Sequence, residues 1–232
     1  MTSILAVTLA RGGSKGCSHK HVRILCGKPV LEYTIDAVQR SKYLNDYVVS
    51  SDDPEILRIA NACGVDTIMR PVALAQDETP TIPALVHAVE TYEKRYKDHF
   101  DYIIEVRATS PLKTAGDIDG VVQLLLDSGA DSVIGVTALE DHHPARAKWI
   151  DDEGRLRDFI PEPASGRRQD LHPKAYIRNG TVYALTRAAL DSGKLFGHTE
   201  SLAYVMPAER SVNIDTDLDL VLCNVLLQRQ EP

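Results

Sequence analysis

Hydrophobic and polar positions follow two alternating patterns along most of the chain. Short continuous apolar runs are typical of strands that are buried on both faces, and the longer segments between them repeat apolar residues at helical spacing. This alternation predicts an α/β fold with a mostly parallel sheet and helices on both faces. The expected strands are 4–9, 47–50, 65–69, 102–106, 132–136, 181–185 and 202–206, and the expected helices are 30–40, 54–63, 81–96, 118–126 and 215–227.

The alternation is interrupted between Leu139 and Ile177. This stretch is rich in Pro, His, Arg and Asp and has few apolar runs, so it predicts an excursion from the sheet, either a lid or an oligomerisation arm. We therefore expect a core formed by residues 1–138 and 178–232 and an inserted arm formed by residues 139–177.

Composition narrows the possible partners. The chain has 232 residues, which is enough for one α/β domain with an appendage, and a net charge of −7. No extended basic face is visible, which argues against nucleic acid as a partner. No long apolar stretch or leader is found, and the four scattered cysteines are typical of reduced thiols, so a cytoplasmic protein without membrane contact is expected.

The loop after the first strand carries the strongest chemical signal. Its glycines let backbone N–H groups turn inward as an anion-binding nest, and its basic side chains add positive charge. No acidic residue precedes Glu32, and such a loop lies where open parallel sheets bind ligands. The order matches neither Walker A nor Gly-x-Gly-x-x-Gly, so a simple surface turn is the alternative to a nucleoside triphosphate site. The loop contains Gly12, Gly13 and Gly16 among Arg11, Ser14, Lys15 and Lys20.

A series of motifs resembles one enzyme family along essentially the whole chain. Ala10-Arg11-Gly12-Gly13-Ser14-Lys15-Gly16, followed by Lys20, is similar to the nucleotide loop of the acylneuraminate cytidylyltransferases, the CMP-sialic acid synthetase family. The other matching segments are Gly27-Lys28-Pro29, Val49-Ser50-Ser51-Asp52, Arg70-Pro71, Ala108-Thr109-Ser110-Pro111-Leu112, Glu140-Asp141-His142-His143-Pro144, Arg178-Asn179-Gly180 and Asn213-Ile214-Asp215-Thr216-Asp217.

The resemblance implies a three-layer fold of the nucleotide-diphosphosugar transferase kind and a reaction that joins CTP to a keto-sugar acid with release of pyrophosphate. It also implies a homodimer in which the arm covers the partner's site, and Mg²⁺ held by Asp215 and Asp217. Lys20 and Arg11 would act on charge that develops on the pyrophosphate, and Asp217 would also accept the nucleophile's proton. Without the resemblance, the two carboxylates are equally well explained as helix-capping residues. The implied CTP-binding residues are Ala10, Arg11, Gly12, Gly13, Ser14, Lys15, Lys20, His21, Arg70 and Thr81.

The acceptor side is expected to hold a small anionic molecule. Arg168 is the residue that the resemblance places on the acceptor's carboxylate, because a guanidinium can donate two parallel hydrogen bonds to it. A solvated charge run is the alternative for residues 167–170. The adjacent histidines His142 and His143 are expected to be structural rather than metal ligands. The implied acceptor-binding residues are Arg107, Thr109, Ser110, Arg168, Lys174, Tyr176 and Asn179.

Two positions depart from the family pattern. His21 stands where the family has an asparagine, and Arg107-Ala108 replaces a glutamine-proline pair whose glutamine faces the sugar. A fixed cation predicts an acceptor with an additional anionic group or a differently oriented carboxylate. The alternative is that Arg107 only pairs with a nearby carboxylate such as Glu105 or Asp101.

These observations favour a Mg²⁺-dependent cytidylyltransferase for a sialic-acid-like acid, of the legionaminic, pseudaminic or sialic type. A cytidylyltransferase for a small phosphonate acid is the alternative within the same class. A nucleotide-sugar-dependent glycosyltransferase and a non-catalytic nucleotide-binding protein are alternatives from other classes.

Overall fold

The computed structural model describes residues 2–13, 17–164, 166–197 and 200–229. Ser14, Lys15 and Gly16 of the glycine-rich loop therefore lie outside the described residues.

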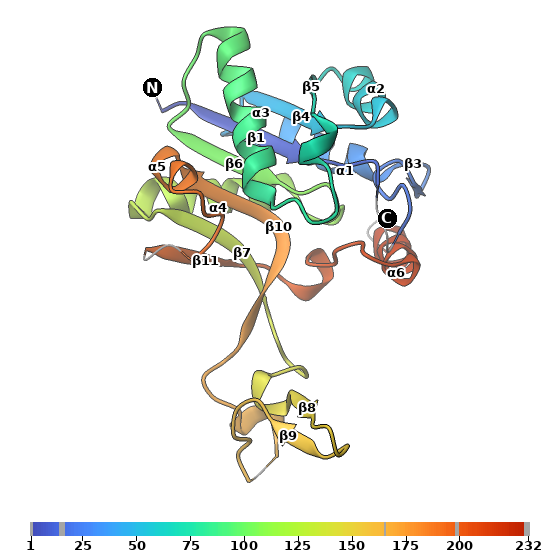
Figure 1. Ribbon diagram of the computed structural model, residues 1–232, viewed down its shortest axis with the longest axis vertical. Coiled ribbons are helices and arrows are strands. Elements are labelled where there is room, and N and C mark those ends of the chain that lie inside the picture. Colours follow the sequence, from blue (N-terminus) through green and yellow to red (C-terminus); the bar gives the residue numbers. More distant parts are fainter. Residues whose placement is uncertain (1, 14–16, 165, 198–199, 230–232) are drawn as a thin grey trace.

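A seven-stranded sheet forms the centre of the molecule (Figure 1). Its strand order is β11-β7-β10-β6-β1-β4-β5; β10 runs antiparallel to both of its neighbours, and every other pair in the sheet is parallel. The expected mostly parallel sheet is confirmed. The strands are β1 (Ile4–Leu9), β4 (Asp46–Ser51), β5 (Asp66–Met69), β6 (Tyr102–Val106), β7 (Ser132–Ala138), β10 (Tyr176–Thr186) and β11 (Ser201–Val205).

Helices cover both faces of this sheet and complete the expected three layers. On one face, α1 (Val30–Gln39), α2 (Pro54–Ala62) and α4 (Ala115–Ser128) pack against side chains such as Ala6 and Ile104. On the other face, α3 (Thr81–Tyr96) and α5 (Arg187–Asp191) pack against alternate residues of the same strands, such as Val7 and Ile103. Strands that bury both faces explain the continuous apolar runs in the sequence.

Capping residues set the helix boundaries. The Asp53 carboxylate accepts a hydrogen bond from the Glu55 N–H, and Pro54 occupies the first turn of α2. Thr114 and Asp117 form a capping box, so α4 begins three residues before the expected start at 118. A second capping box, of Thr216 and Asp219, starts α6 (Asp217–Gln228) two residues after the expected start and leaves Asp215 in the preceding loop.

Residues 139–175 leave the sheet between β7 and β10 and project away from it (Figure 1). They contain a small antiparallel hairpin of β8 (Lys148–Ile150) and β9 (Leu156–Asp158), which the sequence pattern did not predict. Trp149, Phe159 and several other apolar side chains of this segment are exposed. The remaining elements are the short strands β2 (Ile24–Leu25) and β3 (Lys28–Pro29) and the 3₁₀ turns η1 (Val72–Leu74), η2 (Pro144–Arg146), η3 (Arg168–Asp170) and η4 (Ala208–Arg210).

Among the helices of the described ranges, none has the length and apolar composition needed to cross a membrane. All four cysteines are free thiols.

Candidate active site

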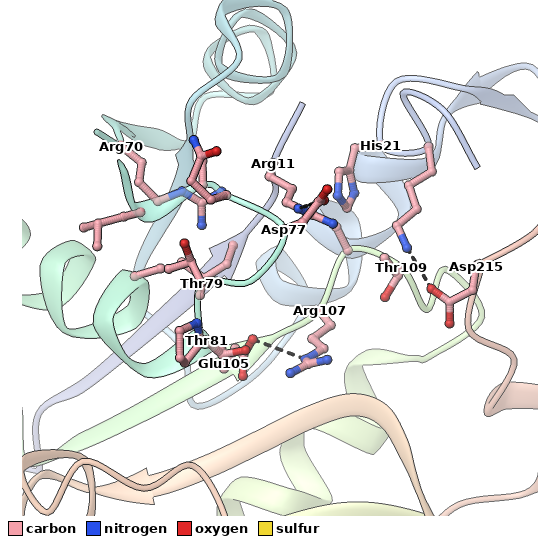
Figure 2. Close-up of a pocket in the computed structure, with 18 of the residues that line it drawn as sticks. Arg11, His21, Arg70, Asp77, Thr79, Thr81, Glu105, Arg107, Thr109 and Asp215 are labelled. Atoms are coloured by element: carbon pink, nitrogen blue, oxygen red, sulfur yellow. Dashed lines mark hydrogen bonds and ion pairs between the residues drawn. The ribbon is translucent and has the colours of Figure 1, made fainter. Parts of the chain in front are cut away.

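A cavity of about 450 Å³ opens at the carboxyl ends of β1, β5 and β6 (Figure 2). Leu9 ends β1, Arg70 follows β5, and Arg107 follows β6. The segment that precedes α6 supplies Asn213 and Asp215, and the loop before α3 supplies Asp77 and Thr79. The volume lies in the range of small-molecule sites. The residues that line the cavity are Leu9, Arg11, Lys20, His21, Arg70, Leu74, Ala75, Gln76, Asp77, Thr79, Pro80, Thr81, Ala84, Glu105, Arg107, Ala108, Thr109, Asn213 and Asp215.

The first residues of the glycine-rich loop are anchored to the sheet. The Ala10 N–H donates to the Ser50 carbonyl at 3.0 Å, and the Gly12 N–H donates to Asp52 Oδ1 at 3.1 Å. A Cβ atom on Gly12 would lie 2.6 Å from Oδ2 of Asp53, so only glycine fits there. Gly13 has open space around its Cα. Ala10, Gly12 and Gly13 do not line the cavity, and the predicted contacts of Ser14 and Lys15 fall on residues that the structure does not describe.

Basic side chains from three segments reach the cavity, and each is close to a carboxylate. Arg11 Nη1 donates to Asp77 Oδ1 at 2.5 Å, and Lys20 Nζ donates to Asp215 Oδ1 and to the Ile214 carbonyl, both at 2.8 Å. Arg70 Nη2 lies 3.7 Å from Asp52 Oδ1. The structure thus brings Arg11 and Lys20, which come from the loop after β1, to the same cavity as Arg70, which is distant from them in sequence.

His21 and Arg70 are buried polar residues with unused hydrogen-bonding atoms. Nδ1 of His21 and Nε of Arg70 have no hydrogen-bond partner among the described residues. Burial lowers the pKa of His21 to about 3, with smaller contributions in the same direction from the positive charges of Lys20, Arg70 and Arg11. The imidazole is therefore neutral, so it can both donate and accept a hydrogen bond as an asparagine side chain can.

Glu105 and Arg107 form a second charged group in the same cavity. Their side chains point to the same face of β6, and Arg107 Nε lies 3.2 Å from Glu105 Oε1 (Figure 2). The contact is an ion pair, and Nε has no hydrogen-bond partner in the described chain. The guanidinium also lies over the Tyr183 ring, 4.9 Å from its centroid. Arg107 therefore pairs with Glu105, as in the alternative interpretation of this residue. It also lines the cavity, so a contact with an acceptor stays a prediction.

The buried Lys113 side chain stabilises the loop between β6 and α4 by hydrogen bonds. Lys113 Nζ donates to the carbonyls of Arg107 and Ser110 at 2.6 and 2.7 Å and to Thr34 Oγ1 at 2.7 Å. Ser110 is also buried, and its hydroxyl donates to the Gly180 carbonyl at 3.1 Å. Thr109 lines the cavity, whereas Ser110 supports the loop and does not line it, and the acceptor contacts predicted for both stay predictions.

Four predicted acceptor-binding residues lie elsewhere. Asn179 is buried at the β10 bulge, where its amide donates to Ser211 Oγ at 3.0 Å and its carbonyl oxygen accepts from Thr181 Oγ1 at 2.6 Å. Arg168 pairs with Glu140 at 2.8 Å in the projecting segment. Lys174 and Tyr176 are exposed at the base of that segment. None of the four lines the cavity of its own chain, and their acceptor contacts stay predictions.

The two carboxylates predicted to bind metal face different surroundings. Asp215 lines the cavity beside Lys20, whereas Asp217 lies in the first turn of α6 and accepts from Arg23 Nη1 at 3.1 Å. The described residues contain no group of three or more His, Cys, Asp or Glu side chains arranged to hold a metal ion. The Asp215 carboxylate is the hard oxygen donor that Mg²⁺ prefers, and it lies where triphosphate oxygens could complete a coordination shell. Asp215 therefore fits the predicted metal, and Asp217 does not line the same cavity.

Of the two adjacent histidines, His143 has a structural role. His143 is buried; its Nδ1 accepts from the Ala145 N–H at 3.2 Å and caps the short turn η2. Its Nε2 lies 2.9 Å from the Pro173 carbonyl.

Sequence reasoning missed Glu105, Asp77 and Lys113 as components of the site. Glu105 was considered only as a partner of Arg107, and the one available signal was a charged residue inside an otherwise apolar strand. Asp77 and Lys113 lie in loops where charged residues are common, so their sequence surroundings gave no signal.

Comparison with known proteins identifies the family. The sequence profile described as Cytidylyltransferase matches residues 5–151. The chain is 29% identical to the N-acylneuraminate cytidylyltransferase of Streptococcus agalactiae serotype V over 94% of this chain and 51% of that protein. It is also 29% identical to the post-translational flagellin modification protein B of Campylobacter coli over 99% of this chain and 97% of that protein. The chain spans about half the length of the streptococcal relative.

Solved structures support the same fold. A CMP:2-keto-3-deoxy-manno-octonic acid synthetase in complex with CTP superposes with a TM-score of 0.74 at 18% identity, covering 99% of this chain and 100% of that one. A 4-diphosphocytidyl-2C-methyl-D-erythritol synthase from Anaerococcus prevotii superposes with a TM-score of 0.65 at 17% identity, covering 98% and 99%. At these identities the likeness establishes the fold alone. The profile match covers more than half of the chain, and the chain therefore belongs to the cytidylyltransferase family.

Proposed function

We propose that this protein joins CTP to a hydroxyl group of a sialic-acid-like keto-sugar acid and releases pyrophosphate. The observation that carries the proposal is the convergence of Arg11, Lys20, His21 and Arg70 on one cavity at the carboxyl edge of the sheet. The names of the streptococcal relative and of the structural neighbour with CTP are consistent with this chemistry.

The basic side chains would act mainly on the leaving group. When the acceptor attacks the α-phosphorus, negative charge moves onto the pyrophosphate. Fixed cations such as Arg11 and Lys20 stabilise that charge without reorganisation. In the absence of substrate their charge is balanced by Asp77 and Asp215, and nucleotide binding replaces these carboxylates with phosphate oxygens.

Asp215 is the residue we propose for Mg²⁺. An ion held by this carboxylate would supply further positive charge to the leaving group. Lys20 shares the Asp215 carboxylate, so it would turn toward the phosphates when the carboxylate binds metal.

We propose that residues 139–177 form an arm that pairs two copies of the core, residues 1–138 and 178–232. Its exposed apolar side chains, including Trp149 and Ile150, support an interface with a second copy. An arm that crosses to the partner would also bring Arg168, Lys174 and Tyr176, which lie outside the cavity of their own chain, to the partner's acceptor site. Light scattering tests the dimer.

The test of the activity measures pyrophosphate release with CTP, ATP, GTP or UTP in the presence of Mg²⁺, against a panel of acceptor acids. We expect release with CTP and a sialic-acid-like acid. Binding is measured in parallel by thermal shift, where a nucleotide at a hundred times its Kd should stabilise the fold by about 2.7 kcal/mol. Equal shifts with all four nucleotides would contradict the assignment to cytidine, and release with a small phosphonate alone would replace the acceptor class.

A further inference from the structure

The loop between β6 and α4, which brings Arg107 and Thr109 to the cavity, is built around the buried ammonium group of Lys113. The residue is 4% exposed, and its Nζ donates to Thr34 Oγ1 and to the carbonyls of Arg107 and Ser110. An ammonium group has three N–H donors, so each donor has one acceptor at 2.6 or 2.7 Å. All three acceptors are uncharged, so these contacts fix main-chain positions and do not form a salt bridge.

Packing alone does not explain a lysine at this position. Loss of water around the ammonium lowers the pKa of Lys113 to about 7, and the negative charge of Asp117 offsets part of that fall. An apolar side chain would avoid the cost of a buried charge, but it would remove a donor from each of the three oxygens. The lysine is therefore explained by the shape of the loop that it stabilises.

The first consequence of this arrangement concerns Arg107. Its carbonyl accepts from Lys113 Nζ at 2.6 Å and from Thr34 Oγ1 at 3.4 Å, and its N–H donates to the Thr181 carbonyl of β10 at 2.9 Å. Both polar groups of the Arg107 main chain are thus held, by α1 and the loop on one side and by β10 on the other. Lys113 therefore helps to set the direction in which the Arg107 side chain leaves the backbone.

The second consequence concerns the opposite side of the cavity. The Thr109 carbonyl accepts from the Ile214 N–H at 2.8 Å, and the Ile214 carbonyl accepts from Lys20 Nζ at 2.8 Å. Asp215, which also accepts from Lys20, is the next residue in the chain. Figure 2 shows Thr109 between Arg107 and Asp215. The loop that Lys113 stabilises therefore contacts both of the segments that line these two sides of the cavity.

We propose that Lys113 is a positioning residue, which holds Arg107 and, through Thr109, the Ile214–Asp215 segment in the relative placement that turnover requires. The requirement for turnover rests on the proposed function, whereas the contacts themselves are present without substrate. Lys113 does not line the cavity, so it acts only through the residues that it holds. Without its ammonium group, the carbonyls of Arg107 and Ser110 lose their shared donor, and the loop between them is no longer fixed.

The first test is a double-mutant cycle on kcat/KM for the acceptor, with the wild type, Lys113→Met, Arg107→Gln and the double variant. Methionine keeps the length of the side chain but has no N–H group. We expect Lys113→Met to lower kcat/KM about 10- to 100-fold, because a small displacement of a substrate-positioning residue is sufficient for such a loss. Because Lys113 acts through Arg107, the loss in the double variant should be smaller than the product of the two single losses by about fivefold or more.

The matched control is Phe100→Leu. Phe100 is 1% exposed and precedes β6, so it lies at the edge of the sheet opposite to the cavity. This variant should lower stability, leave kcat/KM unchanged and show no coupling to Arg107→Gln. It therefore separates a loss of position from a general loss of stability.

The second test does not need activity. Amide hydrogen exchange is measured by mass spectrometry on the substrate-free wild type and on Lys113→Met. We expect exchange to become about tenfold faster or more in peptides that contain the Arg107 and Ile214 amides, because local opening exposes their hydrogen bonds. Peptides of α3 should be unchanged.

Each alternative result decides the question. Losses that multiply in the double variant, or unchanged exchange at both amides, would overturn the proposal, as would an equal loss of kcat/KM in Phe100→Leu. If Lys113→Met does not fold, Thr34→Val is measured in the same way, because it removes one of the three acceptors and keeps the side-chain shape. Wild-type kcat/KM and exchange in that variant would exclude the role. A wild-type protein that releases no pyrophosphate overturns the proposed function, and hydrogen exchange then still decides whether Lys113 holds the two segments.

Discussion

The two ends of the cavity hold their charges in different ways. At the end proposed for the triphosphate, Arg11 pairs with Asp77 and Lys20 with Asp215, and these partners are 66 and 195 residues apart in sequence. At the end proposed for the acceptor, Glu105 lies on β6 and Arg107 comes two residues later in sequence, directly after the strand ends. The Asp77 and Asp215 side chains are 37% and 64% exposed, whereas the Glu105 side chain is 3% exposed.

The difference in exposure predicts that a bound substrate can displace Asp77 and Asp215 from their cations, whereas the Glu105–Arg107 pair stays intact. An exposed ion pair contributes little to stability, so an incoming phosphate can replace the carboxylate at small cost. A buried pair cannot dissociate without leaving a charge unpaired, so it is expected to keep its geometry and to select ligands that match it. The triphosphate end should therefore govern rate through charge, and the acceptor end should govern specificity.

The largest expected effect comes from Lys20→Ala. Loss of one fixed cation that acts on transition-state charge lowers kcat by about 10²–10³-fold, with a smaller loss of CTP affinity. Steady-state pyrophosphate release and calorimetric CTP binding measure the two quantities. Lys94→Ala, on the exposed side of α3, is the matched control and should behave as the wild type. A variant that loses affinity as much as rate would show that Lys20 only binds the ground state.

Arg107→Gln should have an intermediate effect confined to the acceptor. Loss of a charge-assisted hydrogen bond costs about 1.5–3 kcal/mol, which corresponds to about a 10- to 150-fold lower kcat/KM for the native acceptor. The ratio of kcat/KM values across the acceptor panel is the measurement, with Arg58→Gln on α2 as the control. If Arg107 served only as the ion partner of Glu105, stability would fall and this ratio would be unaltered.

The smallest expected effect is an increase in CTP affinity. Asp77→Asn removes the carboxylate that pairs with Arg11, whose side chain is 33% exposed, and the freed guanidinium should bind CTP about two- to fivefold more tightly. Calorimetry at low ionic strength is the suitable measurement, because salt screens exposed charges. Weaker CTP binding would mean that Asp77 positions Arg11 for the nucleotide rather than competing with it.

Local patterns in the sequence were sufficient for the layers of the fold, and they singled out the loop whose basic residues reach the cavity. The helix expected over 81–96 matches α3 at both ends, because its apolar spacing is a property of the segment alone. The apolar runs predicted the sheet strands, although β10 begins five residues earlier than expected, since its first part pairs with β7 along the base of the projecting segment. Glycine and basic residues in one loop predicted an anion site whose cations Arg11 and Lys20 do meet in one cavity.

What the sequence determined by itself was the set of elements, the family resemblance and the chemistry of a loop that is continuous in the chain. Only the tertiary structure decided which carboxylate meets which cation, that Asp215 and not Asp217 lines the cavity, and that Glu105 is buried there with an unused oxygen. The physical reason is that periodicity and capping act over a few residues. Pairing across the cavity depends instead on the strand order, which brings the ends of β1, β5 and β6 and the segment before α6 to the same edge of the sheet.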